Sequence, residues 1–355
     1  MDSKKDIRIV DIARMAGVSI GTVDRVIHKR GRVSEESLKK VNAVLSMVNY
    51  SPNIFARSLV SKKNYKVVAL IPQHSTDDYW MYISEGLERA SEEAKSSGIA
   101  FERLYFNQYD RASFEKSIER LLTLDVDGVI IANFFSSEVV RISKALDVRN
   151  IPYVYIDANI EDQNPLAYFG THSYDSGAVA ARIISGRIGQ KEDILIAKMF
   201  HNSKELSNQV LSRQKGFLDY IERSAFAGKI YYADLKIDAH IRNFEALDKI
   251  FDEQTGHSIR AAITFNSTCH VLANYLKVRD RKLTYLVGYD LIEKNKVLLK
   301  EGYIDLLIGQ RPELQGYRAL KVITDKLLLN LQSEKINYMP IDLLIKENID
   351  YYQNL

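Results

Sequence analysis

The chain has 355 residues, 46% hydrophobic and 27% charged, a composition typical of a globular protein with more than one domain. No apolar run approaches the ~20 residues that a membrane-spanning helix needs, and the charged start MDSKKDIRIVDIAR lacks the apolar core of a secretory signal. The single cysteine, Cys269, excludes an intramolecular disulfide and a cysteine metal cluster, so we expect a cytoplasmic protein.

The net charge of +3 hides an asymmetry along the chain. Residues 1–66 hold 14 Lys and Arg against 6 Asp and Glu, a net +8, whereas the remaining residues hold 35 against 40, a net −5. A small basic module on a mildly acidic body is expected when one end of a protein binds phosphate groups. A solvated basic tail is the alternative, but here periodic apolar residues lie between the basic ones.

The first fifty residues predict a helix-turn-helix followed by a third helix. Apolar residues at helical spacing place a first helix over 8–16, which Gly17 ends, and Ser19 can cap a second helix over 20–28. Ser34, followed by two glutamates, marks the start of the third helix. The residues expected to pack these helices together are Ala13, Val18, Val23, Val26, Val41, Val44, Leu45 and Val48.

The second helix of this unit is expected to enter the major groove of DNA. Arg25 can offer two hydrogen bonds to a guanine edge, and Ile20 can contact a thymine methyl. Asp24 either orients Arg25, accepts from a cytosine amino group or faces solvent, whereas Gly21 either permits a close backbone approach or weakens the helix. Basic residues of the following loop are expected to meet phosphates, which gives affinity without sequence information. The residues expected at the DNA are Ile20, Gly21, Thr22, Asp24, Arg25, His28, Lys29, Arg32, Asn53, Arg57 and Leu59.

Residues 51–65 predict a hinge with a short helix. Pro52 holds Ser51 extended, and Asn53 can cap a helix from Ile54 to about Val60. A helix this short is unstable alone in water, so a second copy or DNA would have to support it. Leu59 is then an apolar wedge for a minor-groove step, or it packs against the neighbouring domain.

The segment that runs from IRIVDIARMAGVS to NYSPNIFARSL resembles the headpiece and hinge of the lactose-repressor (LacI/GalR) family. The matching parts are DIARMAGVS…TV.RV, the VS that opens the third helix, and NYSPN…A.SL. The resemblance implies that Ile20, Gly21 and Arg25 read bases and that Leu59 intercalates. The family more often has a serine at the position of Asp24 and a bulkier polar residue at that of Gly21, so the operator sequence does not transfer.

From residue 66 onward, strand-like apolar runs alternate with amphipathic helical stretches. This alternation predicts parallel sheets covered by helices, and its length predicts an α/β core of two Rossmann-like lobes. The expected strands are 66–72, 128–132, 152–157, 193–199, 261–265 and 283–289, and the expected helices include 80–97, 138–149, 205–225 and 267–277. The expected domains are an all-α headpiece at 1–50, the hinge at 51–65 and a ligand-binding core at 66–355, with an N-lobe of about 66–160 and 311–337 and a C-lobe of about 161–309 and 338–355.

Ligands in such folds bind beyond the carboxyl ends of the strands, so polar residues there are site candidates. Singly, each has a plainer explanation: an Asp after a strand is often a cap or turn former, and Arg213 alone is more often a surface residue. Tyr79 and Trp80 alone are more often core residues. Together, carboxylate, amide and guanidinium groups with aromatic faces suit a polyhydroxylated ligand. The candidates are Tyr79, Trp80, Asp157, Arg213, Asn266, Asp290 and Gln310.

The segments DYW…G, YID, RQKGF, TFNS, VGYD and IGQRPELQGY resemble, in order, type I periplasmic sugar-binding proteins of the ribose type, which share the fold of LacI-family cores. The resemblance covers about 66–345 and implies that Tyr79 and Trp80 stack on the ligand while the other five candidates hydrogen-bond it. Ala158 stands where ribose-type sites often have an arginine, and Ser267 where an aspartate is common, so a simple ribose site is not expected. A sugar acid or phosphosugar stays open, and further rim candidates are His74, Thr76, His172 and Asp175.

These features predict a transcription regulator, expected to be a repressor, that senses a small sugar or sugar derivative and uses no cofactor. One headpiece contacts only a half-site, so we expect a homodimer on a pseudo-palindromic double-stranded operator. Lobe closure on the ligand would alter the pairing of the hinges, and the choice between inducer and corepressor stays open. A transport or chemotaxis binding protein would need export and no headpiece. An enzyme of carbohydrate metabolism would need a Walker loop, metal cluster or nucleophile–base motif, and the sequence has none.

Overall fold

The computed structural model describes residues 9–27, 31–47, 64–200, 207–237, 239–253 and 259–352. The chain divides into two compact units, Met1–Arg57 and Ser58–Leu355. No helix in these described ranges is long and apolar enough to cross a membrane. The expected hinge helix lies outside the described residues, as do His28, Lys29, Val48, Asn53, Arg57 and Leu59.

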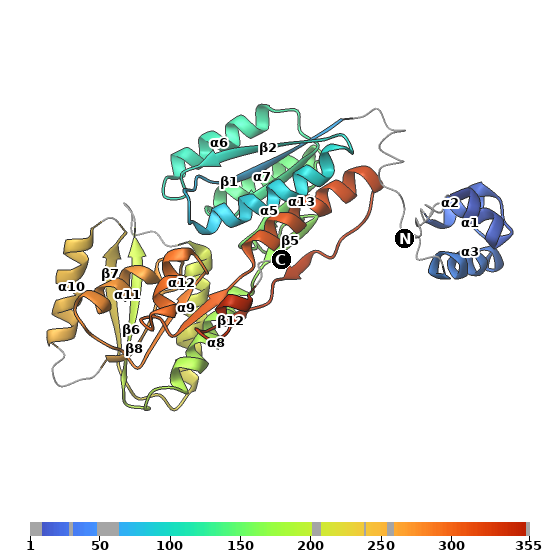
Figure 1. The fold of residues 1–355 in the computed structure, drawn as a ribbon. Coiled ribbons are helices and arrows are strands. Elements are labelled where there is room, and N and C mark those ends of the chain that lie inside the picture. The colour runs from blue at the N-terminus through green and yellow to red at the C-terminus, as the bar shows by residue number, and fades with distance from the viewer. Residues whose placement is uncertain are drawn as a thin grey trace. The chain divides into compact units, whose positions relative to one another are not determined.

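The first unit contains the three expected helices, α1 (Ile9–Ala16), α2 (Ile20–Ile27) and α3 (Glu35–Met47), drawn in blue in Figure 1. Gly17 ends α1 in the left-handed region, with φ +63°, which suits a residue without a Cβ. The Ser19 hydroxyl accepts from Thr22 N at 3.2 Å, and the Ser34 hydroxyl accepts from Ser37 N at 3.3 Å. The helix-turn-helix and both serine caps are therefore confirmed.

The three helices share a small apolar core. Ile12, Val23 and Val41 are fully buried, one from each helix. Val18 and Leu45 pack against the edge of this core and are half-buried. The complete buried set is Ile12, Ala13, Ala16, Val23, Val26, Val41 and Val44. The expected packing of the headpiece is thus confirmed for each named residue that the structure describes.

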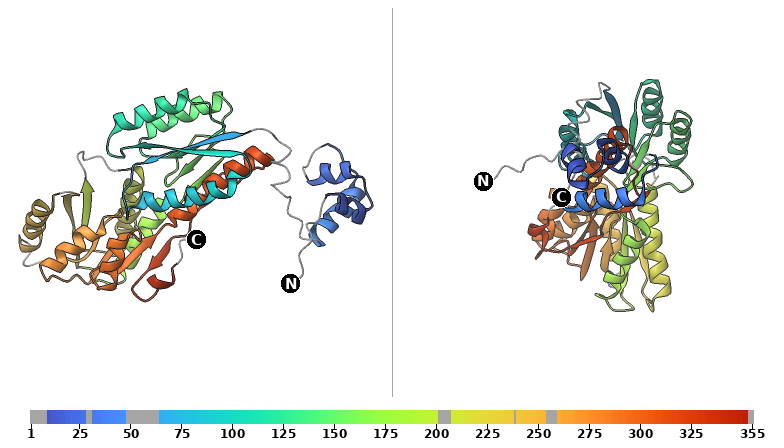
Figure 2. Two further views of the ribbon diagram at one scale, coloured as in Figure 1. Left: turned by 45° about the horizontal axis from the view of Figure 1, so that its top comes forward. Right: turned by 90° about the vertical axis from the view of Figure 1, so that its right-hand side faces the viewer.

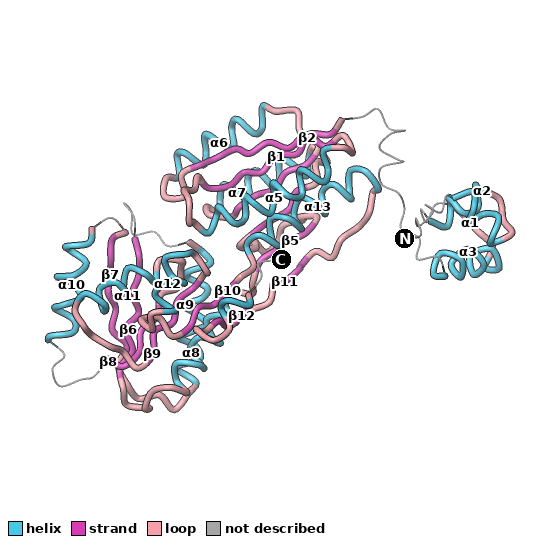
Figure 3. Tube along the Cα trace, in the orientation of Figure 1, coloured by secondary structure: helices cyan, strands magenta, loops and turns pink. Residues whose placement is uncertain are grey.

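The second unit consists of two lobes, each built on a six-stranded sheet between layers of helices (Figure 3). The sheet of the first lobe has the strand order β11-β5-β4-β3-β1-β2 and is parallel throughout. Its strands are β1 (Tyr65–Pro72), β2 (Ile99–Phe106), β3 (Gly128–Ala132), β4 (Tyr153–Ile156), β5 (Ala167–Gly170) and β11 (Ile336–Tyr338). Its helices are α5 (Tyr79–Lys95), α6 (Arg111–Thr123), α7 (Ser136–Val148) and α13 (Pro312–Leu329).

The sheet of the second lobe has the order β12-β10-β9-β8-β6-β7 and is parallel except for the pairing of β10 with β12. Its strands are β6 (Asp193–Phe200), β7 (Ile230–Lys236), β8 (Ile259–Ile263), β9 (Tyr285–Tyr289), β10 (Leu306–Gly309) and β12 (Asp342–Leu344). Its helices are α8 (Ser173–Ser185), α9 (Asn208–Arg223), α10 (His240–Glu253), α11 (Cys269–Val278) and α12 (Glu293–Lys300), and a 3-10 turn follows at Ile349–Tyr351.

The boundary between the lobes differs from the sequence-based expectation. The N-lobe was expected to end near residue 160, but β5, at 167–170, pairs with β4 and belongs to the first sheet. The chain therefore crosses between lobes after Gly170, again after Gly309 and a third time after Tyr338. The apolar run AYFG is only four residues long, which is why periodicity alone did not identify it as a strand.

Helices α8 and α9 of the second lobe lie side by side with their backbones in close contact. A Cβ atom on Gly177 would lie 1.9 Å from the backbone oxygen of Arg213, and a Cβ on Gly216 would lie 1.9 Å from that of Tyr174. Neither side has room for a side chain, so the two glycines set the spacing of the helices. This contact fixes the backbone of Arg213, whose side chain reaches Phe265 and Gln310.

Candidate functional site

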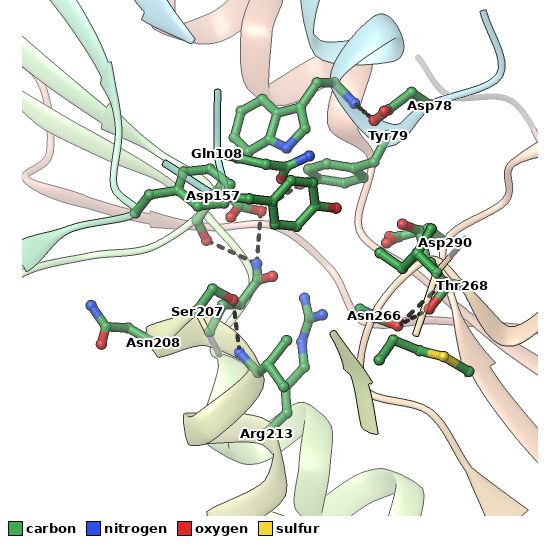
Figure 4. Close-up of a pocket in the computed structure, with 18 of the residues that line it drawn as sticks. Asp78, Tyr79, Gln108, Asp157, Ser207, Asn208, Arg213, Asn266, Thr268 and Asp290 are labelled. Carbon is green, nitrogen blue, oxygen red and sulfur yellow. Dashed lines mark hydrogen bonds between the residues drawn. The ribbon is translucent and has the colours of Figure 1, made fainter. Parts of the chain in front are cut away.

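A cavity of about 710 Å³ lies between the lobes at the carboxyl ends of their strands. This volume falls within the range of about 300–1,000 Å³ that small-molecule sites occupy. Six of the seven residues expected to bind a ligand line it: Tyr79, Trp80, Asp157, Arg213, Asn266 and Asp290. The seventh, Gln310, lies behind the cavity and is hydrogen-bonded to Asp290 and Arg213. Figure 4 shows Tyr79 and Asp157 entering from the first lobe and Arg213, Asn266 and Asp290 entering from the second.

Two carboxylates at the base of the cavity follow strands directly. Asp157 comes after β4 with φ +71°, and Asp290 comes after β9 with φ +66°. Asp tolerates this left-handed conformation better than most residues, and such strained positions cluster at binding sites. Asp157 is 5% exposed and Asp290 is 6% exposed. The backbone thus turns one buried carboxylate of each lobe toward the same space.

Asp157 is held by donors from both lobes. The Tyr79 hydroxyl donates to Asp157 Oδ1 at 2.8 Å, and Gln209 Nε2, from α9 of the second lobe, donates to the same oxygen at 2.7 Å. Behind it, Gln315 Oε1 accepts from Asp157 N at 3.2 Å, and Gln315 Nε2 donates to Gln310 O at 2.8 Å. The first-lobe carboxylate is therefore tied both to the second lobe and to the crossing at residue 310.

Arg213 carries the buried positive charge at the base. Its side chain is 1% exposed, Nη1 donates to Phe265 O at 2.8 Å, and Nη2 donates to Gln310 Oε1. Gln310 Nε2 donates onward to Asp290 Oδ1 at 2.6 Å. Arg213 Nε is buried and has no hydrogen-bond partner among the described residues. The guanidinium has five N–H donors, so the two bonds to Phe265 and Gln310 leave donor capacity at Arg213, which lines the cavity.

Burial dominates the titration of both carboxylates. It raises the pKa of Asp290 to about 7, against the opposing effects of the Arg213 charge and the Gln310 hydrogen bond. Burial likewise raises the pKa of Asp157, opposed by Arg213, Tyr79 and Gln209. The charge of Asp157 raises the pKa of Asp290 further, because a nearby like charge disfavours ionisation. Such perturbed groups in a cavity are typical of functional sites.

Aromatic rings cover the first-lobe side of the cavity. The Trp80 ring centre lies 5.4 Å from that of Tyr79 and 5.5 Å from that of Phe134, which also lines the cavity. Across the cavity, Asn266 Oδ1 accepts from Thr268 Oγ1 at 2.5 Å, which orients the amide of Asn266. Apolar faces opposite polar groups can hold a ligand whose two sides differ, as the faces of a sugar ring do.

Some expected residues lie elsewhere, and some lining residues were not expected. His74, Thr76, His172 and Asp175 do not line the cavity. His172 Nδ1 accepts from Asp175 N at 3.3 Å and caps α8 instead. The cavity-lining residues missed from the sequence include Asp78, Gln108, Arg111, Phe134, Asn208, Gln209, His270 and Lys294. For Gln209 a usable signal existed, since it precedes Arg213 by one helical turn and shares its face of α9.

The rims of the cavity also join the lobes. Asp77 of the first lobe accepts from Lys294 N at 3.1 Å and from Glu293 N, at the start of α12 in the second lobe. On another rim, Asn208 Nδ2 of α9 donates to Ser136 Oγ of α7. A carboxylate at a helix N-terminus is favoured by the helix dipole, so these contacts stabilise the arrangement of lobes described here.

The expected DNA-reading helix presents its side chains outward. Ile20 is 52% exposed, and Gly21 and Arg25 are exposed, whereas Thr22 and Asp24 are half-buried. Arg25 Nε donates to Gly21 O of the same helix at 3.0 Å, and this bond holds the Arg25 side chain along α2. Arg32, after the helix, is also exposed.

Two family models match this chain. Residues 8–53 match the model described as "Bacterial regulatory proteins, lacI family", and residues 68–329 match the model described as "Periplasmic binding protein domain". The first match covers the three-helix unit and the second covers both lobes of the core.

Named relatives agree with these matches. Catabolite control protein A of Staphylococcus xylosus is 29% identical over 221 residues, which are 58% of this chain and 65% of that protein. The sucrose operon repressor of Streptococcus mutans is 26% identical over 294 residues, 80% of this chain and 82% of that protein. The alignments with the first two catabolite control proteins span only 65% and 53% of their lengths.

Solved structures share the fold of the core. A protein from Bacteroides fragilis, described as a LacI transcriptional regulator, superposes with a TM-score of 0.77 at 36% identity and covers 82% of this chain and 100% of its own. A solute-binding protein from Burkholderia graminis, solved with D-arabinose, superposes with a TM-score of 0.71 at 17% identity and covers 82% and 99%. At that identity the second likeness concerns the fold alone.

Proposed function

Because the chain belongs to the LacI family of bacterial regulatory proteins, we propose that it is a sequence-specific DNA-binding repressor controlled by a small sugar or sugar derivative bound between its two lobes. The observation that carries the proposal is the cavity at Asp157, Arg213 and Asp290, on the same chain as a helix-turn-helix. We place the protein in the cytoplasm, with its DNA, and assign it no catalytic activity.

The sugar class follows from the chemistry of the base. Asp157 and Asp290 can accept from hydroxyl groups, the Arg213 guanidinium can donate to a ring or hydroxyl oxygen, and Asn266 can do either. Tyr79 and Trp80 supply apolar faces. The sucrose operon repressor, a relative over 80% of this chain, supports a carbohydrate by analogy. The six predicted residues that line the cavity remain our candidates for direct contact, and Gln310 is proposed to position Arg213 and Asp290 behind them.

On the DNA side, we assign base readout to the exposed face of α2. Arg25 supplies two Nη groups for a guanine edge, and Ile20 supplies an apolar contact for a thymine methyl. His28, Lys29 and Arg32 are proposed to meet phosphates, and Asn53, Arg57 and Leu59 are proposed for the hinge and minor groove. Two copies of the chain would bind two half-sites, which makes a homodimer on a pseudo-palindromic operator our proposal.

Ligand binding can be tested with the chain's own fluorescence. Trp80 is the single tryptophan, is 3% exposed and lines the cavity, so its emission reports on this site alone. The full chain would be titrated with D-arabinose, D-glucose, myo-inositol, sucrose, a sugar acid and a phosphosugar. We expect a saturable change with at least one of them. No change with any, together with unaltered melting temperature, would remove the sugar-sensing half of the proposal.

DNA binding needs a separate test. The purified chain would select fragments from a genomic library, with and without a small-molecule extract of cells. We expect recovered fragments to share an inverted repeat, because two half-sites match two headpieces. Recovery of unrelated fragments under both conditions would refute the regulator assignment.

A further inference from the structure

His270 lines the cavity, although the sequence did not predict it there. It is the second residue of α11, and its side chain is half-buried. Of its two ring nitrogens, Nδ1 lies 3.3 Å from Asn295 Oδ1, whereas Nε2 has no hydrogen-bond partner among the described residues. A neutral imidazole carries a proton on one nitrogen and a lone pair on the other. The partner of Nδ1 therefore determines whether Nε2 donates or accepts.

The orientation of the Asn295 amide follows from its other bonds. Asn295 is fully buried in the first turn of α12. Its Nδ2 donates to Ser267 O at 2.9 Å and to Tyr289 O and Asp290 O at 3.0 Å, and its Oδ1 accepts from His270 N at 2.9 Å. The reverse orientation would set Oδ1 against three carbonyl oxygens and Nδ2 against a backbone N–H. The amide oxygen is therefore the atom that faces His270.

This oxygen determines the tautomer of the His270 ring. An amide oxygen accepts a hydrogen bond and cannot donate one, so Nδ1 of His270 carries the proton and Nε2 carries the lone pair. Burial lowers the pKa of His270, and the charge of Lys294 lowers it further, against the opposing hydrogen bond to Asn295. The ring is therefore neutral at pH 7, and Nε2 is a hydrogen-bond acceptor.

Nε2 of His270 is open to the cavity. It is not one of the fully buried polar atoms that lack a partner among the described residues, so solvent reaches it, and the ring lines the cavity. Asp290 and Ser267, whose backbone oxygens accept from Asn295, line the same cavity. One buried amide therefore sets the position of His270 relative to the Asp290 carboxylate on the second-lobe wall.

From this arrangement we infer that His270 is a further ligand-binding residue of the cavity: its Nε2 accepts a hydrogen bond from a hydroxyl group of the effector, and Asn295 is the positioning residue that fixes it as an acceptor. The inference rests on the proposed function and narrows its ligand class. A hydroxyl brings the proton that Nε2 needs, whereas an ionised phosphate or carboxylate oxygen has none to donate. His270 therefore selects an effector with a hydroxyl at this point and discriminates against its deoxy counterpart.

The first test needs no ligand. The full chain, with ¹⁵N-labelled histidine, would be examined by NMR at neutral pH, where correlations from the carbon-bound ring protons distinguish protonated from unprotonated ring nitrogens. His270→Gln identifies the signals of His270 among those of the seven histidines. We expect a proton on Nδ1 and none on Nε2. A proton on Nε2 would overturn the inference.

The second test measures affinity. The probe is whichever sugar of the panel saturates the Trp80 fluorescence change, titrated by calorimetry against His270→Asn and His270→Gln. An asparagine amide can replace Nδ1 at Asn295 but does not reach the position of Nε2, which a glutamine amide oxygen can take. We expect His270→Asn to bind about threefold to tenfold more weakly, the usual effect of one hydrogen bond, and His270→Gln to lose less. His172→Asn, outside the cavity at the start of α8, is the matched control and should leave affinity unchanged.

Deoxy derivatives of the same sugar connect the effect with one hydroxyl. The derivative that lacks the hydroxyl bonded to His270 should bind the unmodified chain about threefold to tenfold more weakly than the parent sugar. His270→Asn should bind this derivative and the parent sugar equally well, because the two changes remove the same bond. A merely structural role of His270 would weaken the binding of every derivative by the same factor.

Unchanged affinity in His270→Asn would refute the inference, as would a loss by the same factor for the parent sugar and for every deoxy derivative. If no sugar of the panel binds the unmodified chain, the proposed sugar-sensing function fails. The tautomer of His270 then decides separately: a proton on Nδ1 supports an acceptor in the cavity, and a proton on Nε2 excludes it.

Discussion

The guanidinium carbon of Arg213 lies 4.1 Å from the centre of the Tyr289 ring, directly below the cavity. The contact places a desolvated cation on an aromatic face, in addition to the hydrogen bonds to Phe265 and Gln310. Tyr289 ends β9, and Asp290 follows it. The end of β9 therefore supports the Arg213 cation through the Tyr289 ring and supplies the Asp290 carboxylate. The ring contact and the two hydrogen bonds all use the planar guanidinium group of Arg213.

Arg213→Lys tests that dependence. A lysine cannot reach both partners with one planar group, so we expect a loss of stability of about 1–3 kcal/mol from buried acceptors left unsatisfied. We also expect sugar binding to fall below detection by calorimetry. Arg223→Lys, on the exposed end of the same helix, is the control and should cost little in urea denaturation. Sugar binding that survived Arg213→Lys would displace Arg213 from the ligand-binding set.

Asp290 gives the protein a pH dependence with a defined sign. Its folded pKa is raised to about 7 from 3.8, so between these values the folded state holds a proton that the unfolded chain has released. Stability from this group is therefore present at low pH and falls as pH rises toward 7, by at most about 1.4 kcal/mol per pH unit. Asp290→Asn removes the dependence. We would measure the melting temperatures of Asp290→Asn and of the unmodified chain from pH 5 to pH 7. The value for the variant minus the value for the unmodified chain should increase with pH, and a constant difference would contradict the burial effect.

Gly177 tests the packing that positions Arg213. A methyl group on Gly177 would meet Arg213 O at 1.9 Å, so Gly177→Ala must push α8 and α9 apart. We expect a destabilisation of about 1–3 kcal/mol in urea, typical of overpacking, and a parallel loss of sugar affinity. Gly186→Ala at the end of the same helix is the control, because its Cβ would meet its nearest neighbour only at 3.4 Å. Equal effects of both variants would refute the close-contact argument.

Arg25→Ala tests base readout by α2. We expect discrimination between a selected fragment and a random duplex to fall by about 1–3 kcal/mol, the usual value of a two-bond contact to a base pair. The measurement is a gel-shift titration at fixed salt, because phosphate contacts are salt-dependent. Arg14→Ala removes an exposed charge of α1 that pairs with Asp11, and should leave the ratio unchanged. If Arg25→Ala also leaves it unchanged, Arg25 has no part in base readout.

Much of this architecture could be predicted because it depends on local patterns. Helical periodicity and the serine caps gave all three headpiece helices, and apolar runs gave β1, β3, β4, β6, β8 and β9 within two residues at either end. The strands missed have other patterns. In β2, charged Glu102 and Arg103 interrupt the apolar residues, and in β7 exposed side chains alternate with buried ones. Both are edge strands, which are buried on fewer sides and carry a weaker signal.

The candidate site was predictable where strand ends determine it. Asp157, Asn266 and Asp290 follow strands, so their convergence follows from parallel topology. The helical spacing of Gln209 and Arg213 could have identified Gln209 as a lining residue, but its bond to Asp157, 52 positions earlier, depends on the placement of the two lobes. Likewise, the boundary after β5 depends on a pairing with β11, more than 150 residues later, which no local pattern encodes.

The last two strands of the chain, β11 and β12, each form one edge of a sheet of the sensor core. β11 and β12, within residues 336–344, are edge strands next to β5 and β10, each of which is buried along its whole length. They belong to the red end of the chain in Figure 2. A chain that stopped before them would still encode the three headpiece helices with their own core, but both sensor lobes would have a bare apolar edge. Such a fragment would be prone to aggregation and proteolysis. We therefore expect a product truncated before residue 336 to be removed, and not to occupy DNA without responding to a ligand.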